Sequence, residues 1–151
     1  MIRLLSVLFL LIATALGATY DGIFKLSEAI NGEGESVPLV NGKPFVLVVR
    51  SESPTHYAMS LRLGNSLRCD MKVSPSTDAS AHDRVHVGDV MSTMMMPPEN
   101  IFKVEQFLTS YLPNSTDIYL SDDGDTLTLE GDGKIVFARE DSHAGDSGTN
   151  L

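Results

Sequence analysis

The chain has 151 residues, with 20 acidic and 11 basic side chains and a formal net charge of −9. That length is enough for one domain with its own hydrophobic core. Because the surplus charge is negative, we expect no binding to nucleic acid and no electrostatic attraction to anionic membranes.

Residues 1–17 have the three parts of a secretory signal peptide. Arg3 supplies the positive charge, residues 4–16 are largely apolar, and Ala15 and Gly17 are the small residues of a cleavage site. The run is shorter than the roughly 20 apolar residues of a transmembrane helix. We expect cleavage without membrane insertion, and a product that is secreted or held in the secretory-pathway lumen, or in the periplasm of a bacterium. Retention as a membrane anchor is the alternative.

Two strands are predicted in the N-terminal part of the domain. The first is short, at residues 23–26, and the turn signal Asn31-Gly32 follows it. After a second turn at residues 41–44, the run Phe-Val-Leu-Val-Val occupies residues 45–49. A continuous β-branched run of this kind is typical of a central strand that is covered on both faces.

A β-hairpin is predicted next, with strands at residues 57–63 and 67–73 joined by a turn at 64–66. The second strand contains Cys69, the only cysteine, so the chain has no internal disulfide. Apolar residues alternate with polar ones around it and place Cys69 on the apolar face. We predict a buried, unreactive thiol, and the alternative is a free thiol for intermolecular pairing.

The next segment is predicted to begin with a long surface loop. Residues 74–83 have no apolar periodicity, and we favour a tolerated insertion over a mobile functional loop. Residues 84–91 then alternate in the manner of another strand.

Four methionines close together are the most unusual feature of the composition: Met91, Met94, Met95 and Met96. We favour the interpretation that they close the core beneath the helix that follows. If they are exposed, they are the candidate partner-binding residues, because flexible thioether side chains adapt to apolar surfaces. A third interpretation is a set of soft ligands for Cu(I).

One amphipathic helix is predicted from Pro98-Glu99 to the stop signal Pro113-Asn114. Its apolar stripe has helical spacing and consists of Ile101, Val104, Leu108, Tyr111 and Leu112, widened by Phe102 and Phe107. The polar residues Lys103, Glu105, Gln106 and Thr109 are expected on the other face. Directly after the helix, Asn114-Ser115-Thr116 is a sequon, so Asn114 is a candidate glycosylation site in a eukaryotic secretory pathway.

The C-terminal part is predicted to be a β-meander with strands at residues 117–121, 126–130 and 134–139. Glycine-containing turns join these strands. The tail at residues 140–151 is rich in Asp, Ser, Gly and Thr and is predicted to be disordered. The folded domain is therefore expected to span residues 18–139.

No motif in the sequence supports catalysis or the binding of calcium or zinc. The acidic residues of 122–125 are followed directly by the alternating polar and apolar residues of a strand. This pattern favours a hairpin turn over a calcium loop. The histidines are dispersed and form no zinc signature: His56, His82, His86 and His143. A hydrolase using Cys69 and His86 is the weakest alternative, because no activating partner is identifiable. We expect no enzymatic activity and no cofactor.

Four stretches together form a recognisable pattern: Val-Met-Ser-Thr-Met-Met-Met-Pro-Pro-Glu at 90–99, Glu-Gln-Phe-Leu at 105–108, Gly-Asp-Thr-Leu-Thr-Leu at 124–129 and Asp-Gly-Lys at 132–134. This pattern resembles the META domain family, which includes HslJ-type bacterial heat-shock proteins and META proteins of trypanosomatid parasites. The resemblance spans residues 20–139 and is sharp only from Val87 onward. Family members commonly have Thr-Arg-Met and then Cys or another small residue where this chain has three methionines. No role of that Arg or Cys is therefore transferred.

The resemblance implies an α+β fold, with a strongly curved, mostly antiparallel and barrel-like sheet and one amphipathic helix packed across it. It implies no agreed enzymatic activity, and associations with stress, drug tolerance, secretion or virulence. Our leading hypothesis is a non-enzymatic monomer that binds an unknown protein. The alternatives are a carrier of a small apolar ligand, such as a lipid, in the curved sheet, and a chaperone-like stress factor that uses the methionines.

Overall fold

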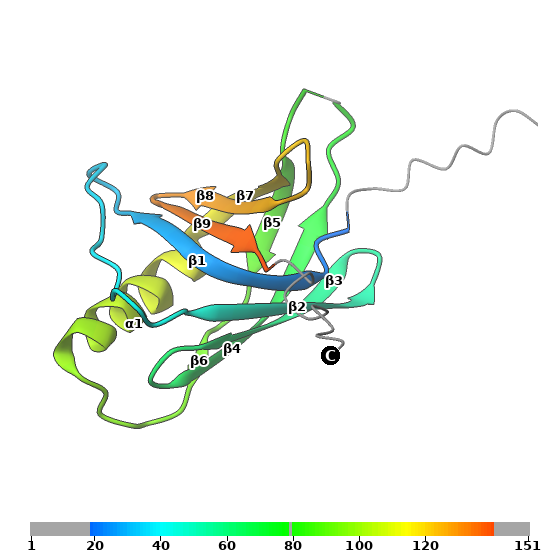
Figure 1. Cartoon of the computed structure of the whole chain (residues 1–151). Helices are drawn as coiled ribbons and strands as arrows, with labels where there is room; N and C mark the ends of the chain where they lie inside the picture. The colour runs from blue at the N-terminus through cyan, green and yellow to red at the C-terminus, as the bar shows by residue number, and fades with distance from the viewer. Residues whose placement is uncertain (1–18, 79, 141–151) are drawn as a thin grey trace, which may run out of the picture.

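The computed structural model describes residues 19–78 and 80–140 (Figure 1). Its strands are β1 (Gly22–Ile30), β2 (Val46–Ser53), β3 (His56–Arg62), β4 (Ser66–Ser74), β5 (Asp83–Val87), β6 (Met91–Ser92), β7 (Ser115–Leu120), β8 (Thr126–Gly131) and β9 (Lys134–Arg139). The helices are α1 (Glu99–Tyr111) and the short 3-10 helix η1 (Leu112–Asn114). The expected β-rich domain with one amphipathic helix is confirmed.

The sheet closes into an antiparallel barrel. The strand order is β3-β2-β1-β9-β8-β7-β5-β4-β6, and β3 also pairs with β4, which leaves β6 as an addition to an eight-stranded ring. Irregularities in the pairing, such as the one between Leu26 and Glu28 of β1, add the local bend that a small barrel needs. The predicted curved, barrel-like sheet is therefore correct.

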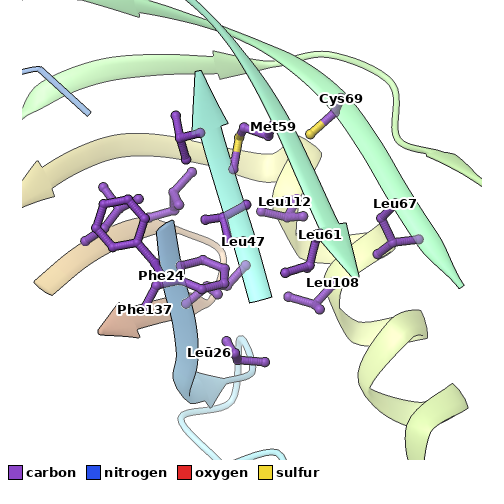
Figure 2. Close-up of a cluster of buried hydrophobic side chains, with 14 of the residues drawn as sticks. Phe24, Leu26, Leu47, Met59, Leu61, Leu67, Cys69, Leu108, Leu112 and Phe137 are labelled. Atoms are coloured by element: carbon purple, nitrogen blue, oxygen red, sulfur yellow. The ribbon is translucent and has the colours of Figure 1, made fainter. Parts of the chain in front are cut away.

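The inside of the barrel is filled by side chains. Figure 2 shows them gathered from β1, β2, β3, β4, β9 and the helical segment into one cluster. Members with almost no exposed surface include Phe24, Leu47, Leu108, Leu127 and Phe137. The core is therefore a packed interior, and an apolar ligand placed there would have to displace these side chains.

Helix α1 lies across one end of the barrel. Its buried apolar residues are Ile101, Val104, Phe107 and Leu108. Close approaches tie the helical segment to the strand connections at that end: a Cβ at Gly64 would lie 3.3 Å from Ile101, and one at Gly133 would lie 2.6 Å from Tyr111. Two helix predictions were wrong, because Phe102 is exposed and Glu105 is buried.

Most of the predicted strands are confirmed, including the hairpin around residues 64–66 and the C-terminal meander. Strand β1 is longer than expected, because pairing with β9 continues past the irregularity to Ile30. Strand β2 is central, since it pairs with β1 and β3, but its outer face is not covered and Val48 is only half-buried there. The strand predicted at residues 84–91 is divided into β5 and β6.

The predicted signal peptide at residues 1–17 lies outside the described residues, as does the tail beyond Glu140. Within residues 19–78 and 80–140, no helix is both long enough and apolar enough to cross a bilayer.

Candidate functional site

The four methionines lie on the surface, so the core interpretation was wrong. The exposed fractions are 67% for Met91, 100% for Met94, 60% for Met95 and 95% for Met96. Met94, Met95 and Met96 belong to residues 93–96, which we call the methionine loop. The loop connects β6 to the Pro97-Pro98 pair before α1, and it contributes no side chain to the core.

The side chain of Asn65 holds the backbone of the methionine loop. The N–H of Met95 donates to Oδ1 of Asn65 at 2.8 Å, and Nδ2 of Asn65 donates to the carbonyl oxygen of Met95 at 3.0 Å. The hydroxyl of Thr93 donates to the same Oδ1 at 3.0 Å and accepts from the N–H of Ser66 at 3.0 Å. One asparagine therefore satisfies both polar groups of the Met95 backbone.

Asn65 is in turn held by Glu105 of α1. The N–H of Asn65 donates to Oε1 of Glu105 at 2.6 Å, and its Nδ2 donates to Oε2 at 2.8 Å. Both residues are only 4% exposed. Hydrogen bonds of buried groups are expensive to break, because the separated groups have no access to water. The helix, the β3–β4 turn and the methionine loop therefore form one hydrogen-bonded unit.

Gly64 allows the β3–β4 turn to approach the end of the methionine loop. A Cβ at Gly64 would lie 2.6 Å from Cβ of Pro97, closer than side chains in proteins approach one another. Helix α1 begins directly after Pro98, whose carbonyl oxygen accepts from the N–H of Phe102 at 2.9 Å. A glycine at this position is therefore a condition for the observed path of the loop.

Met91 is placed differently from the loop methionines. It lies on β6, opposite Arg68 of β4, and lines a cleft on the outer face of the barrel. The candidates therefore separate into Met91, on a strand, and three residues on a loop that Asn65 anchors.

Cys69 is a buried thiol, as predicted. It is 7% exposed, and burial raises the pKa of the thiol to about 11, with the neighbouring Asp70 adding to the effect. The thiol is therefore protonated at neutral pH, the unreactive form. His86 is exposed between the buried Val85 and Val87, so it lies on the outer face of the sheet and Cys69 on the inner face. The structure does not bring this pair together.

The acidic residues 122–125 form the turn between β7 and β8. The N–H of Gly124 donates to the carbonyl oxygen of Ser121 at 2.8 Å, and Gly124 has a φ of 77°, which favours glycine. The predicted hairpin turn is confirmed. Among the described residues, no group of three or more His, Cys, Asp or Glu side chains is arranged to hold a metal ion.

Asn114 is exposed at the end of η1. Its Nδ2 donates to the carbonyl oxygen of Ser110 at 2.9 Å. Attachment of a glycan replaces one of the two Nδ2 hydrogens, so the remaining hydrogen can still make this bond.

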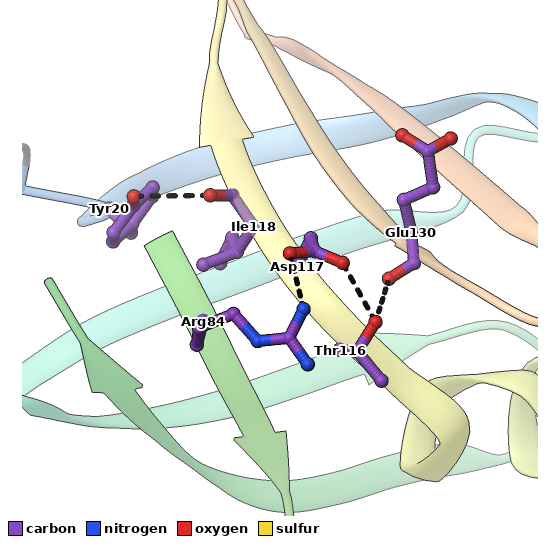
Figure 3. Close-up of polar contacts among 6 residues, drawn as sticks. All are labelled: Tyr20, Arg84, Thr116, Asp117, Ile118 and Glu130. Atoms are coloured by element: carbon purple, nitrogen blue, oxygen red, sulfur yellow. Dashed lines mark hydrogen bonds and ion pairs between the residues drawn. The ribbon is translucent and has the colours of Figure 1, made fainter. Parts of the chain in front are cut away.

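The opposite end of the barrel contains polar contacts that the sequence did not reveal. The hydroxyl of Tyr20 donates to Oδ2 of Asp83 at 2.6 Å, and it also points toward the carbonyl oxygen of Ile118 (Figure 3). Burial raises the pKa of Tyr20, and the bond to Asp83 raises it further. Nearby, the guanidinium of Arg84 forms an ion pair with Asp117 at 2.9 Å. These contacts join segments far apart in the chain, which no local pattern predicts.

The fold defines a small closed β-barrel with one end covered by helix α1. A family model for the META domain matches residues 24–143, and the chain belongs to the META domain family. Among solved structures, the barrel is similar to an NMR structure of a protein from Burkholderia xenovorans, with a TM-score of 0.57 and 15% identity over 80% of this chain and 82% of that one. At that identity the likeness shows the fold alone. A comparison with curated proteins found no match.

Proposed function

We propose that this META domain protein has no enzymatic activity and acts by binding a partner protein through the methionine loop. The observation that carries the proposal is the contrast between exposed side chains and a fixed backbone. Met94 and Met96 have almost their whole surface in water. Asn65 holds the backbone of Met95, which lies between these two methionines, and Glu105 holds Asn65.

Such an arrangement suits recognition of an apolar surface. Large apolar side chains exposed next to one another mark interaction sites more often than chance, and methionine adapts its shape to the surface it meets. Because the loop backbone is already ordered, less conformational entropy is lost when a partner binds. The same features support the related idea of a chaperone-like factor, whose clients would be many rather than one.

The absence of catalysis is part of the proposal. Its support is the raised pKa of the Cys69 thiol and the position of His86 on the opposite face of the sheet. The packed interior argues against a lipid carrier whose ligand lies inside the barrel.

We also propose that the protein acts in the secretory pathway or beyond it as a monomer, with a role in stress or virulence. The support is the signal motif at residues 1–17, the family resemblance, and a sequon whose Asn114 side chain is exposed. N-terminal sequencing of the protein recovered from its host should begin at Ala18, and a glycosidase should reduce its mass. Recovery with residues 1–17 intact would contradict the cleavage.

The test of the binding role is site-specific photocrosslinking in the native host. A photoreactive methionine analogue at position 94 or 96 should crosslink a discrete protein, whereas the same analogue at the exposed loop residue Thr77 should not. Affinity of the purified partner should then fall at least about tenfold in a variant with Met94, Met95 and Met96 all replaced by Ser. Met91→Ser is the matched control and should bind normally.

Two outcomes would contradict the proposal. Equal crosslinking from Thr77 would mean that the loop is not selective. An unchanged partner affinity in the triple variant, together with lost Cu(I) binding, would favour the metal-ligand interpretation of the methionines instead.

A further inference from the structure

A cleft on the outer face of the barrel combines apolar side chains with arginine side chains. It has a volume of about 450 Å³, within the range of small-molecule sites. Its lining includes Val48 of β2, Ala58 and Ser60 of β3, and Arg50, Arg68 and Met91. The core residues Met59 and Cys69 border it as well, but its other lining residues are on the outer face, so a ligand could enter without displacing the packed interior.

The pairing register explains how these residues come together. Val48 lies opposite Ser60, Ser60 opposite Arg68, and Arg68 opposite Met91, so one row crosses four neighbouring strands. Ile23 of β1 lies opposite Val48 and extends the row with another exposed apolar side chain. Side chains in one row of an antiparallel sheet share a face. The row is thus apolar at both ends, with a hydroxyl and a guanidinium between them.

The charges on this face are not explained by folding. Arg62 does not line the cleft but lies beside it, because it is opposite Ser66 and so is a diagonal neighbour of Arg68 on the same face. Diagonal neighbours on a sheet lie roughly 7–8 Å apart, which is within reach of long side chains, so the two positive charges repel each other weakly. Among the described residues, neither Arg50, Arg62 nor Arg68 has an ion-pair partner, although acidic side chains outnumber basic ones 20 to 11 in the whole chain.

Asp70 is the one acidic side chain that lines the cleft, and it offsets part of this charge. It lies opposite Ala58, one row away from Arg68 and two rows away from Arg62. The pair formed by Arg62 and Arg68 is therefore the positive end of the face, and Val48, Ala58 and Met91 are its apolar part.

We propose that this cleft binds a small anionic amphiphile. The guanidinium of Arg68 in the cleft and that of Arg62 beside the cleft hold its carboxylate or phosphate head, with the hydroxyl of Ser60 adjacent to both, because the planar fork of arginine matches both groups. The hydrocarbon part lies over Val48, Ala58 and Met91. A bound anion also relieves the repulsion between the two arginines.

The position of the cleft favours a small molecule over an added peptide strand. Strand β3 is paired on both sides, with β2 and β4, so its backbone offers no free edge for strand addition. Recognition must therefore use the side chains of the face. The inference is independent of the methionine loop, because none of the loop residues contributes to it.

The test is an NMR titration of the full chain with octanoate, octan-1-ol and acetate as probes. Octanoate should shift the amide signals of Val48, Ser60 and Arg68, and octan-1-ol and acetate should bind at least about tenfold more weakly, since each lacks one part of the amphiphile. The double variant Arg62→Gln/Arg68→Gln should weaken octanoate binding at least about tenfold. The matched control Lys43→Gln/Lys103→Gln, with the same change of net charge at exposed positions elsewhere, should bind like the parent protein.

Three results would overturn the inference. Equal binding of octan-1-ol and octanoate would show that the arginines take no part, and this comparison needs no variant to fold. Shifts confined to core residues such as Phe24 and Phe137 would place the ligand inside the barrel. Tight binding to anionic vesicles that depends on Arg62 and Arg68, without binding of free octanoate, would assign the face to a membrane surface instead.

Discussion

Carboxyl groups organise both ends of the barrel, but with different results. At the helix end, Glu105 accepts hydrogen bonds from Asn65, and Asn65 in turn binds the backbone of the methionine loop, whose methionine side chains are exposed. At the opposite end, Asp83 binds Tyr20, whose ring is buried against the core at 2% exposure. The other carboxylate oxygen of Asp83, Oδ1, accepts from the N–H of Ser76 at 2.9 Å.

The difference shows what each network contributes. The bond from Tyr20 to Asp83 fixes the start of the domain to β5, and the tyrosine ring adds buried apolar area to the same contact. The bonds from Asn65 to the loop add no apolar contact for Met94 or Met96, which remain exposed. The helix end therefore uses buried hydrogen bonds to present a surface, whereas the opposite end uses them to close the fold.

The largest effect should come from removing the side chain of Asn65. In Asn65→Ala, Oε2 of Glu105 and both backbone groups of Met95 lose their partners, and Glu105 stays buried. We expect the free energy of unfolding to fall by about 3 kcal/mol, as measured by urea denaturation. Hydrogen exchange at the amide of Met95 should accelerate more than exchange in the core strands.

The matched control for this prediction is Asn31→Ala. Asn31 also accepts two backbone hydrogen bonds, from Glu33 and Glu35, but in an exposed turn. Its loss should lower stability by only about 1 kcal/mol. Equal effects of the two variants would mean that burial of the Asn65 network contributes nothing.

The second effect tests the close approach at the helix end. In Gly64→Ala, the new methyl group must move Pro97, so we expect a loss of about 2 kcal/mol and a disturbed methionine loop. Gly88→Ala is the control, because its Cβ would meet only the carbonyl oxygen of Asp70 at 3.5 Å, an ordinary contact. Thermal unfolding should have a lower midpoint for Gly64→Ala than for Gly88→Ala. The reverse order would contradict the steric explanation.

The methionine loop also shows where prediction from sequence succeeds and fails. The hairpin, the helix and the meander follow from apolar periodicity and turn residues, which are local signals. The run of residues 91–96 has apolar composition without periodicity, and its exposure depends on contacts that composition does not encode. Its anchor joins Asn65 to Glu105 across 40 positions of the chain. Because Glu105 occupies a polar-looking position on the helix, only the three-dimensional fold reveals that it is buried.

The outer face that carries Arg62 and Arg68 is likewise predictable from the sequence only in part. Alternation places Arg62 and Arg68 on the outer side of their strands, and the hairpin register brings them together. The sequence contains both pieces of information, so the face could have been found from the predicted hairpin alone. The contribution of Met91 to the cleft could not, because it depends on β6, whose pairing with β4 no local pattern indicated.

A smaller effect is expected at the opposite end, from Tyr20→Phe. The variant loses the bond to Asp83 and keeps the ring, so stability at neutral pH should fall by about 1 kcal/mol. The folded state raises the pKa of Tyr20 above its ordinary value of 10.0. Its contribution is therefore complete below pH 10 and is lost as the pH rises further, because the unfolded chain releases the proton first.

Urea denaturation between pH 9 and pH 11 measures this difference. The parent protein should lose stability more steeply above pH 10 than Tyr20→Phe does. Cys69, whose pKa is raised to about 11, contributes to the slope in both proteins, so the difference between them isolates Tyr20. Parallel curves would show that the tyrosine hydroxyl is not protected in the folded state.

The smallest effect should come from the ion pair between Arg84 and Asp117, beside the same end of the barrel. The side chain of Arg84 is 64% exposed, so water and salt screen the attraction, and Arg84→Gln should change stability by less than about 0.5 kcal/mol. The effect should become smaller in 1 M NaCl, because the Debye length falls there to about 3 Å and salt weakens the attraction between exposed charges. The loss in Tyr20→Phe, which comes from a buried neutral donor, should persist at that salt concentration. A salt-independent loss in Arg84→Gln would mean that the guanidinium stabilises the β5–β7 pairing through packing, and that this end of the barrel depends on more than its buried tyrosine.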